Sequence, residues 1–162
     1  MQFMTEEEGS LALRDLSGFL VSHPDHLPVG NDRLYSGIPK DSGAKNFLAR
    51  VISQVVKFPC LLWLDEFFVW ESSGNWPLAD LVRRGLGEQR PWHEAPVLLC
   101  NEGDRETVQA LVALAAHNIW DIWVIETQRT RVWHLTHDEG ILLYADSDQL
   151  DDMREFFEGL DK

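Results

Sequence analysis

The stretch WDIWVIETQRTRVWHLTHDEGILLYA (residues 120–145) decides the fold, because three apolar runs in it are separated only by short polar segments. The runs at 120–127, 131–136 and 141–145 are rich in β-branched and aromatic residues, which is typical of strands. The connections QRT and HDEG are too short for a crossover, so each strand must pair antiparallel with the next. The stretch therefore predicts a three-stranded antiparallel meander.

Two further apolar runs precede this meander and alternate with helices. CLLWLDEFFVW (60–70) and PVLLC (96–100) have the dense apolar composition of strands that are covered on both faces. Helical spacing of apolar residues follows each of them, at 76–87 and 103–117. A strand-helix-strand order predicts right-handed crossovers, so we expect 60–70, 96–100 and 120–127 to run parallel. The fold class is then α/β, with a mixed sheet of about five strands, βαβαβ plus the antiparallel meander.

Helices are also predicted near both ends of the chain, two at the N-terminal end and one at the C-terminal end. The first follows Ser10, a suitable N-cap, and the second begins at Ser42. Between these two helices, residues 23–43 show no apolar periodicity and are predicted to form a long loop. The last helix begins at Ser147.

Four residues carry local predictions. Asn118 is expected to take the left-handed conformation that ends helix 103–117, and Gly140 is expected to supply the positive φ of the last hairpin. If the strands are parallel, Cys60 opens one and Cys100 closes another, so the two thiols would lie at opposite ends of the sheet. We expect both to be buried and reduced.

Bulk composition limits the class of protein. With 162 residues, 44% of them hydrophobic, the chain has the size of one ordinary domain, 1–162. No apolar run reaches the length of a membrane span, and the N-terminus MQFMTEEEGS lacks the basic start of a secretory signal, which predicts a cytoplasmic protein. The 27 acids against 14 bases give a net charge of -13, which disfavours nucleic acid and anionic membranes. This charge suits a basic protein partner, although acid can also serve solubility alone.

The strand order brings imidazole and carboxylate groups together. If 131–136 runs antiparallel to 120–127, and 96–100 runs parallel to it, one edge of the sheet collects six side chains. These candidates are His93, Glu94, Asp121, His137, Asp138 and Glu139. Histidine and glutamate are the usual proton-transfer groups, so the edge is a candidate catalytic site. A hairpin turn and a structural hydrogen-bond network explain the same residues more simply, and no catalytic role is assigned.

Motifs for cofactors and metals are absent from the sequence. There is no G-x-G-x-x-G, P-loop lysine, G-x-S-x-G or H-E-x-x-H. The two histidines of HLTH (134–137) supply at most two of the three or four ligands that a zinc site needs. We therefore expect neither a cofactor nor a resident metal.

Four short motifs between residues 63 and 144 resemble a loose group of uncharacterised bacterial proteins. The group's pattern is W-x-S-S-x-N, H-E-A-P, W-D after a helix, and S-H-D-E before a last strand. The corresponding residues here are 70–75, 93–96, 120–121 and 136–139. Glu71 stands where the group has proline, and Thr136 where it has serine. The resemblance implies a bacterial source and motif positions, and it carries no activity.

These features favour a non-enzymatic acidic binding protein. Its most concrete form is a bacterial immunity protein that neutralises a basic toxin. Acids of the last helix and tryptophans at element ends would contact the partner, because exposed tryptophan is a frequent interface residue. The expected partner-binding residues are Glu71, Trp76, Trp92, Asp148, Asp151, Asp152 and Glu155. The alternative is a small hydrolase or metal-dependent enzyme that uses the His/carboxylate edge.

Overall fold

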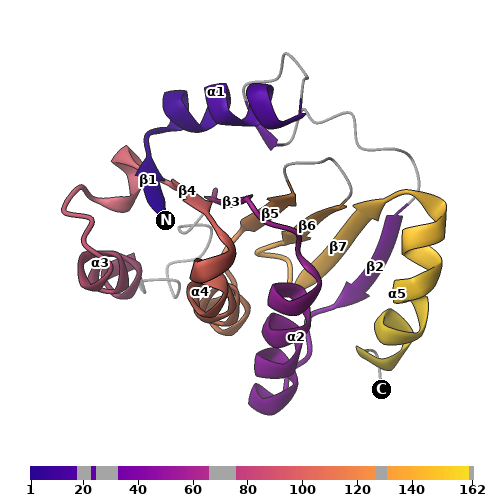
Figure 1. Cartoon of the computed structure of the whole chain (residues 1–162). Coiled ribbons are helices and arrows are strands. Elements are labelled where there is room, and N and C mark those ends of the chain that lie inside the picture. Colours follow the sequence, from indigo (N-terminus) through magenta and orange to yellow (C-terminus); the bar gives the residue numbers. More distant parts are fainter. Residues whose placement is uncertain (18–22, 25–32, 66–75, 127–130, 161–162) are drawn as a thin grey trace.

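The computed structural model describes residues 1–17, 23–24, 33–65, 76–126 and 131–160, and these form a mixed α/β structure around one seven-stranded sheet (Figure 1). The order of the strands is β1-β4-β3-β5-β6-β7-β2, and every pairing is antiparallel. The strands are β1 (Gln2–Met4), β2 (Arg33–Gly37), β3 (Cys60–Leu64), β4 (Val97–Cys100), β5 (Ile122–Glu126), β6 (Arg131–Leu135) and β7 (Gly140–Ala145).

Helices cover the two faces of the sheet unequally. The α-helices are α1 (Glu6–Ser17), α2 (Ser42–Val55), α3 (Trp76–Gly85), α4 (Arg105–Asn118) and α5 (Ser147–Leu160), with short 3-10 turns at Trp92–Glu94 and Glu102–Asp104. Figure 1 shows α1 on one side of the sheet and α2 and α4 on the other. The larger apolar core lies between the sheet and α2, α4 and α5, and a smaller one lies under α1. No helix in the described part of the chain is both long enough and apolar enough to cross a membrane.

The predicted meander is confirmed, and the predicted parallel crossovers are wrong. β5, β6 and β7 pair in sequence, as their short connections require. β3, however, lies between β4 and β5 and runs antiparallel to both. The chain leaves β3 and enters β4 at the same end of the sheet, with α3 on the way, because a helix in a long connection does not oblige the chain to cross over. The connection that contains α4 carries the chain past β3, and the connection that contains α2 carries it past β7, β6 and β5.

Two strands at the edges of the sheet were not predicted. β2 lies inside the segment 23–43, which the sequence predicted to be a loop, and it pairs with β7 from Arg33↔Tyr144 to Gly37↔Gly140. Its side chains alternate between exposed and buried. The sequence does not show the alternation of apolar and polar residues typical of a strand, because positions 36–37 are serine and glycine. β1 has three residues and pairs with β4. Both strands form because the edge of an existing sheet offers unpaired backbone groups.

The first helix begins earlier than predicted. Thr5, and not Ser10, precedes it: Oγ1 of Thr5 accepts a hydrogen bond from N of Glu8 at 3.1 Å, and Oε2 of Glu8 accepts one from N of Thr5 at 2.7 Å. This reciprocal pair is a capping box, which satisfies backbone N–H groups at a helix start. Ser10 lies inside α1, where its hydroxyl donates to the carbonyl oxygen of Glu6.

Two left-handed residues lie one position away from those predicted. Ile119 has a φ of 58° and closes α4, whereas Asn118 is still helical and its side-chain amide donates to the carbonyl oxygen of Leu114. In the β6–β7 hairpin, Glu139 has the positive φ of 58°, and Gly140 is the first residue of β7. Gly140 leaves room for a neighbouring side chain, since a Cβ there would lie 2.9 Å from the Tyr35 ring, which would have to shift.

The two cysteines are directly opposite each other, which corrects the prediction that they lie at opposite ends. Cys60 pairs with Cys100 in the antiparallel β3–β4 register. Both are buried and free, as predicted. The hydrogen bond between the two thiols and their burial hold the pKa of Cys60 far above its ordinary value. Cys60 is therefore in the unreactive thiol form at neutral pH.

Two helical glycines are expected to respond to alanine in opposite ways. A Cβ on Gly9 of α1 would lie 2.6 Å from Cγ2 of Val97, so Gly9→Ala should push α1 off β4 and lower the free energy of unfolding by about 1–3 kcal/mol. A Cβ on Gly159 of α5 meets nothing within 4 Å, so Gly159→Ala should raise the free energy of unfolding by roughly 0.5–1 kcal/mol. Urea unfolding of both variants checks this, and a gain of stability in Gly9→Ala would contradict the close packing of α1.

Candidate functional site

One end of the sheet carries a group of imidazole and carboxylate side chains, here called the His/Asp cluster. β3 and β6 finish at this end and β5 begins there, because β3 runs antiparallel to β5 and β5 runs antiparallel to β6. The backbone N of Asp65 donates to the carbonyl oxygen of Asp121 at 3.0 Å, which extends the β3–β5 pairing up to the cluster. Its members are His23, Asp65, Asp121, His134 and His137.

Asp121 holds His137 by two hydrogen bonds. Oδ1 of Asp121 accepts from the backbone N of His137, and Oδ2 accepts from ring Nδ1, each at 2.6 Å. The Asp121 side chain is 8% exposed, so these bonds form in a poorly hydrated place. An ionised carboxylate only accepts, which makes Nδ1 the protonated nitrogen. Ring Nε2 lies 3.7 Å from Oδ1 of the exposed Asp138.

His134 is an uncharged member of the cluster. Its ring stacks on the indole of Trp123, with centroids 3.6 Å apart and planes inclined by 10°. Nε2 lies 3.8 Å from Oδ1 of Asp121. Burial lowers the pKa of His134 to about 4, and neighbouring His137 acts in the same direction while Asp65 opposes it. At neutral pH this imidazole is therefore neutral and can accept a proton only at a cost.

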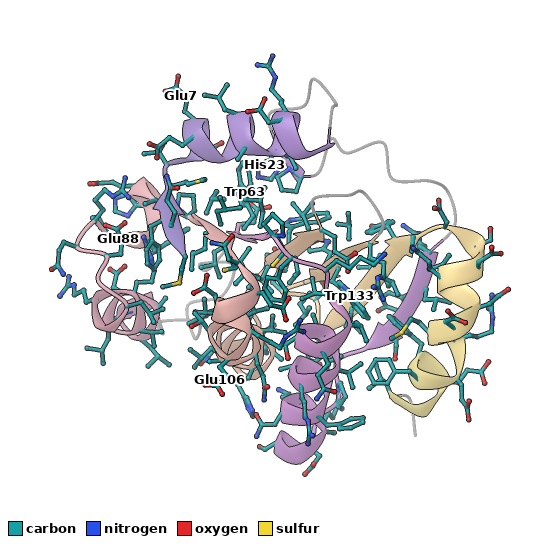
Figure 2. All side chains as sticks on the ribbon, viewed as in Figure 1. Glu7, His23, Trp63, Glu88, Glu106 and Trp133 are labelled. Atoms are coloured by element: carbon teal, nitrogen blue, oxygen red, sulfur yellow. The ribbon has the colours of Figure 1, made fainter. Side chains whose placement is uncertain are left out.

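Asp65 and His23 form the other half of the cluster. Nε2 of His23 lies 3.3 Å from Oδ1 of Asp65. Burial of Asp65 opposes ionisation, but the hydrogen bond and the charge of His23 outweigh it and lower the pKa of Asp65. His23 also contacts Trp63 edge to face, with ring centroids 5.2 Å apart, on the α1 side of the sheet (Figure 2).

The structure brings together only part of the predicted edge. Asp121 and His137 are in direct contact, and Asp138 and Glu139 are exposed in the hairpin beside them. His93 and Glu94 precede β4 at the same end of the sheet, but β3 lies between β4 and β5. Two strand spacings, about 10 Å, therefore separate those two residues from Asp121. The exposed His93 packs edge to face against Trp92 instead.

Three cluster residues lie outside the predicted edge: His134, which was considered only as a zinc ligand, and Asp65 and His23, which were not singled out at all. Asp65 follows the last residue of β3, but the apolar run continues to residue 70 and hid this end of the strand. His23 lies in the segment that was predicted to be a loop. The only signal for either was an ionisable side chain next to an apolar run, which is too common to select a site.

The geometry of the cluster suits proton transfer. Within the described residues, no group of three or more His, Cys, Asp or Glu side chains is arranged to hold a metal ion. An imidazole whose Nδ1 donates to a buried carboxylate has the geometry of a general base, with Nε2 as the accepting atom. Asp121 and His137 show this geometry.

The predicted partner-binding residues lie in different surroundings. Trp92 is 9% exposed and belongs to the larger core, which corrects its placement on a binding surface. Glu71 lies outside the described residues, and Trp76 begins α3 with a side chain that is not described. The remaining four are all exposed on α5: Asp148, Asp151, Asp152 and Glu155.

α5 is the most acidic of the described helices on its solvent side. Its sequence SDQLDDMREFFEGL has five acids and one base. Leu150, Met153 and Phe157 face the core, which leaves the acids in solvent. Arg154, the one base, pairs with Asp151 at 3.1 Å on the surface. Because exposed pairs of this kind contribute little, the helix keeps an acidic face.

A groove lies between the start of α2 and the second half of α5. It has a volume of about 460 Å³ and an apolar floor that includes Phe47, Phe156 and Leu160. Phe47 is 56% exposed, and its ring centroid lies 6.2 Å from that of Phe156. Glu155 and Asp41 stand on the two walls. An exposed aromatic side chain beside acids is therefore a second candidate site.

Comparison of this chain with protein-family models, with curated proteins and with solved structures finds no match.

Proposed function

We propose that this chain is a non-enzymatic binding protein for a basic protein partner, with the acidic face of α5 as its docking surface. The observation that carries the proposal is the exposure of Asp148, Asp151, Asp152 and Glu155 on a single helix. A basic toxin, blocked by direct contact, is the kind of partner that we favour. The net charge of -13 supports the proposal, because such a field accelerates encounter with a cationic surface.

The arrangement of the acids favours contact along the helix. Residues three, four and seven positions apart lie on one side of an α-helix, so Asp148, Asp151, Asp152 and Glu155 form a continuous stripe. A stripe offers a partner several carboxylates in one orientation, which gives specificity of register as well as attraction. Its contacts with solvent-exposed cations are screened at a Debye length of about 8 Å at physiological ionic strength. Binding should therefore weaken with salt.

Charge reversal on α5 tests the proposal. The probe is a labelled twelve-residue peptide of alternating lysine and alanine, followed by fluorescence anisotropy at low salt. Asp152→Lys combined with Glu155→Lys should weaken binding at least tenfold, because two attractive contacts become repulsive. The matched control is Glu7→Lys with Glu106→Lys, which changes the total charge equally at exposed acids of α1 and α4 (Figure 2). Equal weakening in both double variants would refute α5 as the docking surface.

The alternative function is general acid-base catalysis at the His/Asp cluster. The contact between Asp121 and His137 favours it. The same binding assay separates the two functions when it includes His137→Gln. His137 belongs to the His/Asp cluster and not to α5, so this substitution should not alter binding through α5. Loss of binding in His137→Gln, with full binding in the α5 double variant, would move the ligand site to the cluster.

A further inference from the structure

We propose that the groove between α2 and α5 receives one large apolar side chain of a basic partner segment, with the flanking lysines or arginines of that segment on the α5 side. The inference rests on the proposed function and adds the feature by which α5 would distinguish its partner from other cations. An aromatic or long aliphatic residue between basic residues is the chemistry that fits.

The exposure of Phe47 is the first observation behind this inference. Phe47 is 56% exposed, whereas its chain neighbour Leu48 is fully buried in the core. Its ring lies 6.2 Å from the half-buried Phe156 at an inclination of 54°, within the range of favourable aromatic pairs. Two aromatic rings from different helices thus form an apolar surface that solvent reaches.

The size of the groove is the second observation. Its volume of about 460 Å³ lies within the roughly 300–1,000 Å³ typical of small-molecule sites. Pro39, Ala44, Gly159 and Leu160 complete the lining with small or apolar groups. A Cβ on Gly159 would meet nothing within 4 Å, so this wall is open to an incoming side chain. The apolar part of the groove therefore suits an aromatic side chain, and the charged lining residues lie on its walls.

The charges of the two walls give the bound segment a direction. Glu155 is exposed on the α5 wall, and Asp151 and Asp152 lie one turn before it. On the α2 wall, Asp41 is engaged as the helix N-cap, since its carboxylate accepts from N of Ala44 at 2.9 Å, and Lys40 adds a positive charge. Basic residues of the partner are thus attracted toward α5 more than toward the α2 wall, where Lys40 offsets the charge of Asp41.

The charge of the chain also decides against a second copy as the occupant. Two molecules of net charge -13 repel each other, and pairing through α5 would place one acidic stripe beside another. A basic segment meets no such cost. The apolar surface of Phe47 and the acids of α5 are satisfied together only by a partner that carries both kinds of side chain.

Two labelled peptides of equal charge test the inference on the full chain. One carries a central tryptophan between lysines, and the other carries alanine at that position. The wild-type chain should bind the tryptophan peptide at least tenfold more tightly, because burial of one large apolar side chain contributes on that scale. Phe47→Ala should reduce this ratio to nearly one and leave the affinity for the alanine peptide unchanged. Leu81→Ala, at a 66% exposed leucine of α3, is the matched control and should preserve the ratio.

The outcomes separate the inference from the function on which it rests. If wild type binds both peptides equally, the groove does not receive the side chain, while docking on α5 stands. If neither peptide binds, the proposed function fails and the inference fails with it. If Leu81→Ala loses the preference for the tryptophan peptide as Phe47→Ala does, the tryptophan binds through nonspecific hydrophobic contacts. The groove is then excluded as its site.

Discussion

Arg131→Met is expected to lower the free energy of unfolding by about 3–5 kcal/mol, because it removes the cation that lies against a buried carboxylate. Nε of Arg131 lies 3.1 Å from Oε1 of Glu126, whose side chain is 0% exposed, and the Arg131 side chain itself is 14% exposed. Arg131 also donates from Nη2 to the carbonyl oxygen of Val55 at 2.6 Å, so it ties β6 to the end of α2. Urea unfolding at neutral pH measures the loss.

A double variant separates the effect of the Glu126–Arg131 ion pair from the effect of the other contact that Arg131 makes. Glu126→Met combined with Arg131→Met replaces both partners by apolar side chains, and such replacements of buried pairs are often neutral. We expect the double variant to lie within about 2 kcal/mol of wild type, the remainder being the hydrogen bond to Val55. A double variant that is less stable than Arg131→Met would show that the pair itself stabilises this end of the sheet.

The second large effect is a loss of stability on acidification that depends on His134. The pKa of this imidazole is about 4 in the folded chain, against an ordinary histidine value of 6.5. Between these two values the unfolded chain binds the proton and the folded chain does not, so stability falls as the pH falls through this window. A shift of this size corresponds to about 3 kcal/mol, at about 1.4 kcal/mol for each unit. The contribution is complete above pH 6.5 and lost near pH 4.

His134→Phe isolates this effect, since phenylalanine keeps a ring on Trp123 and does not titrate. The free energy of unfolding, measured from pH 7 to pH 4.5, should fall less steeply in His134→Phe than in wild type. Glu88 does not interfere, because hydrogen bonding to Arg90 lowers its pKa to about 2 and its own contribution is lost only below about pH 4.5. Parallel curves for the two proteins would mean that His134 is not held in its neutral form by the fold.

Two of the five members of the His/Asp cluster, Asp121 and His137, were predicted to lie at one edge, and the reason is the length of the connections. Asp121 and His137 border β5 and β6, which a short connection forces to pair, so their approach follows from the sequence. Asp65 joins them only because β3 pairs with β5, across more than fifty residues of chain. His93 is kept apart by the same pairing. Local chain geometry thus predicted one dyad, and the placement of one strand decided the rest.

The acidic face of α5 could be recognised from the sequence, but the groove beside it could not. The stripe of acids follows from helical periodicity within a single segment. The groove forms only where α2 approaches α5. From the sequence pattern alone, Phe47 is assigned to the apolar face of its helix. Only the packing of the two helices leaves that side chain exposed.

The sequence by itself determined the helices α2 to α5, the β5–β6–β7 meander and the acidic character of the surface, because each depends on periodicity, short connections or composition. The tertiary structure alone decided the direction of β3, the pairing of Cys60 with Cys100, and the two edge strands. A long connection allows the following buried strand to run in either direction. Both directions bury its apolar faces equally well, so the residues of the strand do not indicate which one is adopted. The choice between them comes from the packing of side chains that are distant in sequence, so it appears only in the assembled sheet.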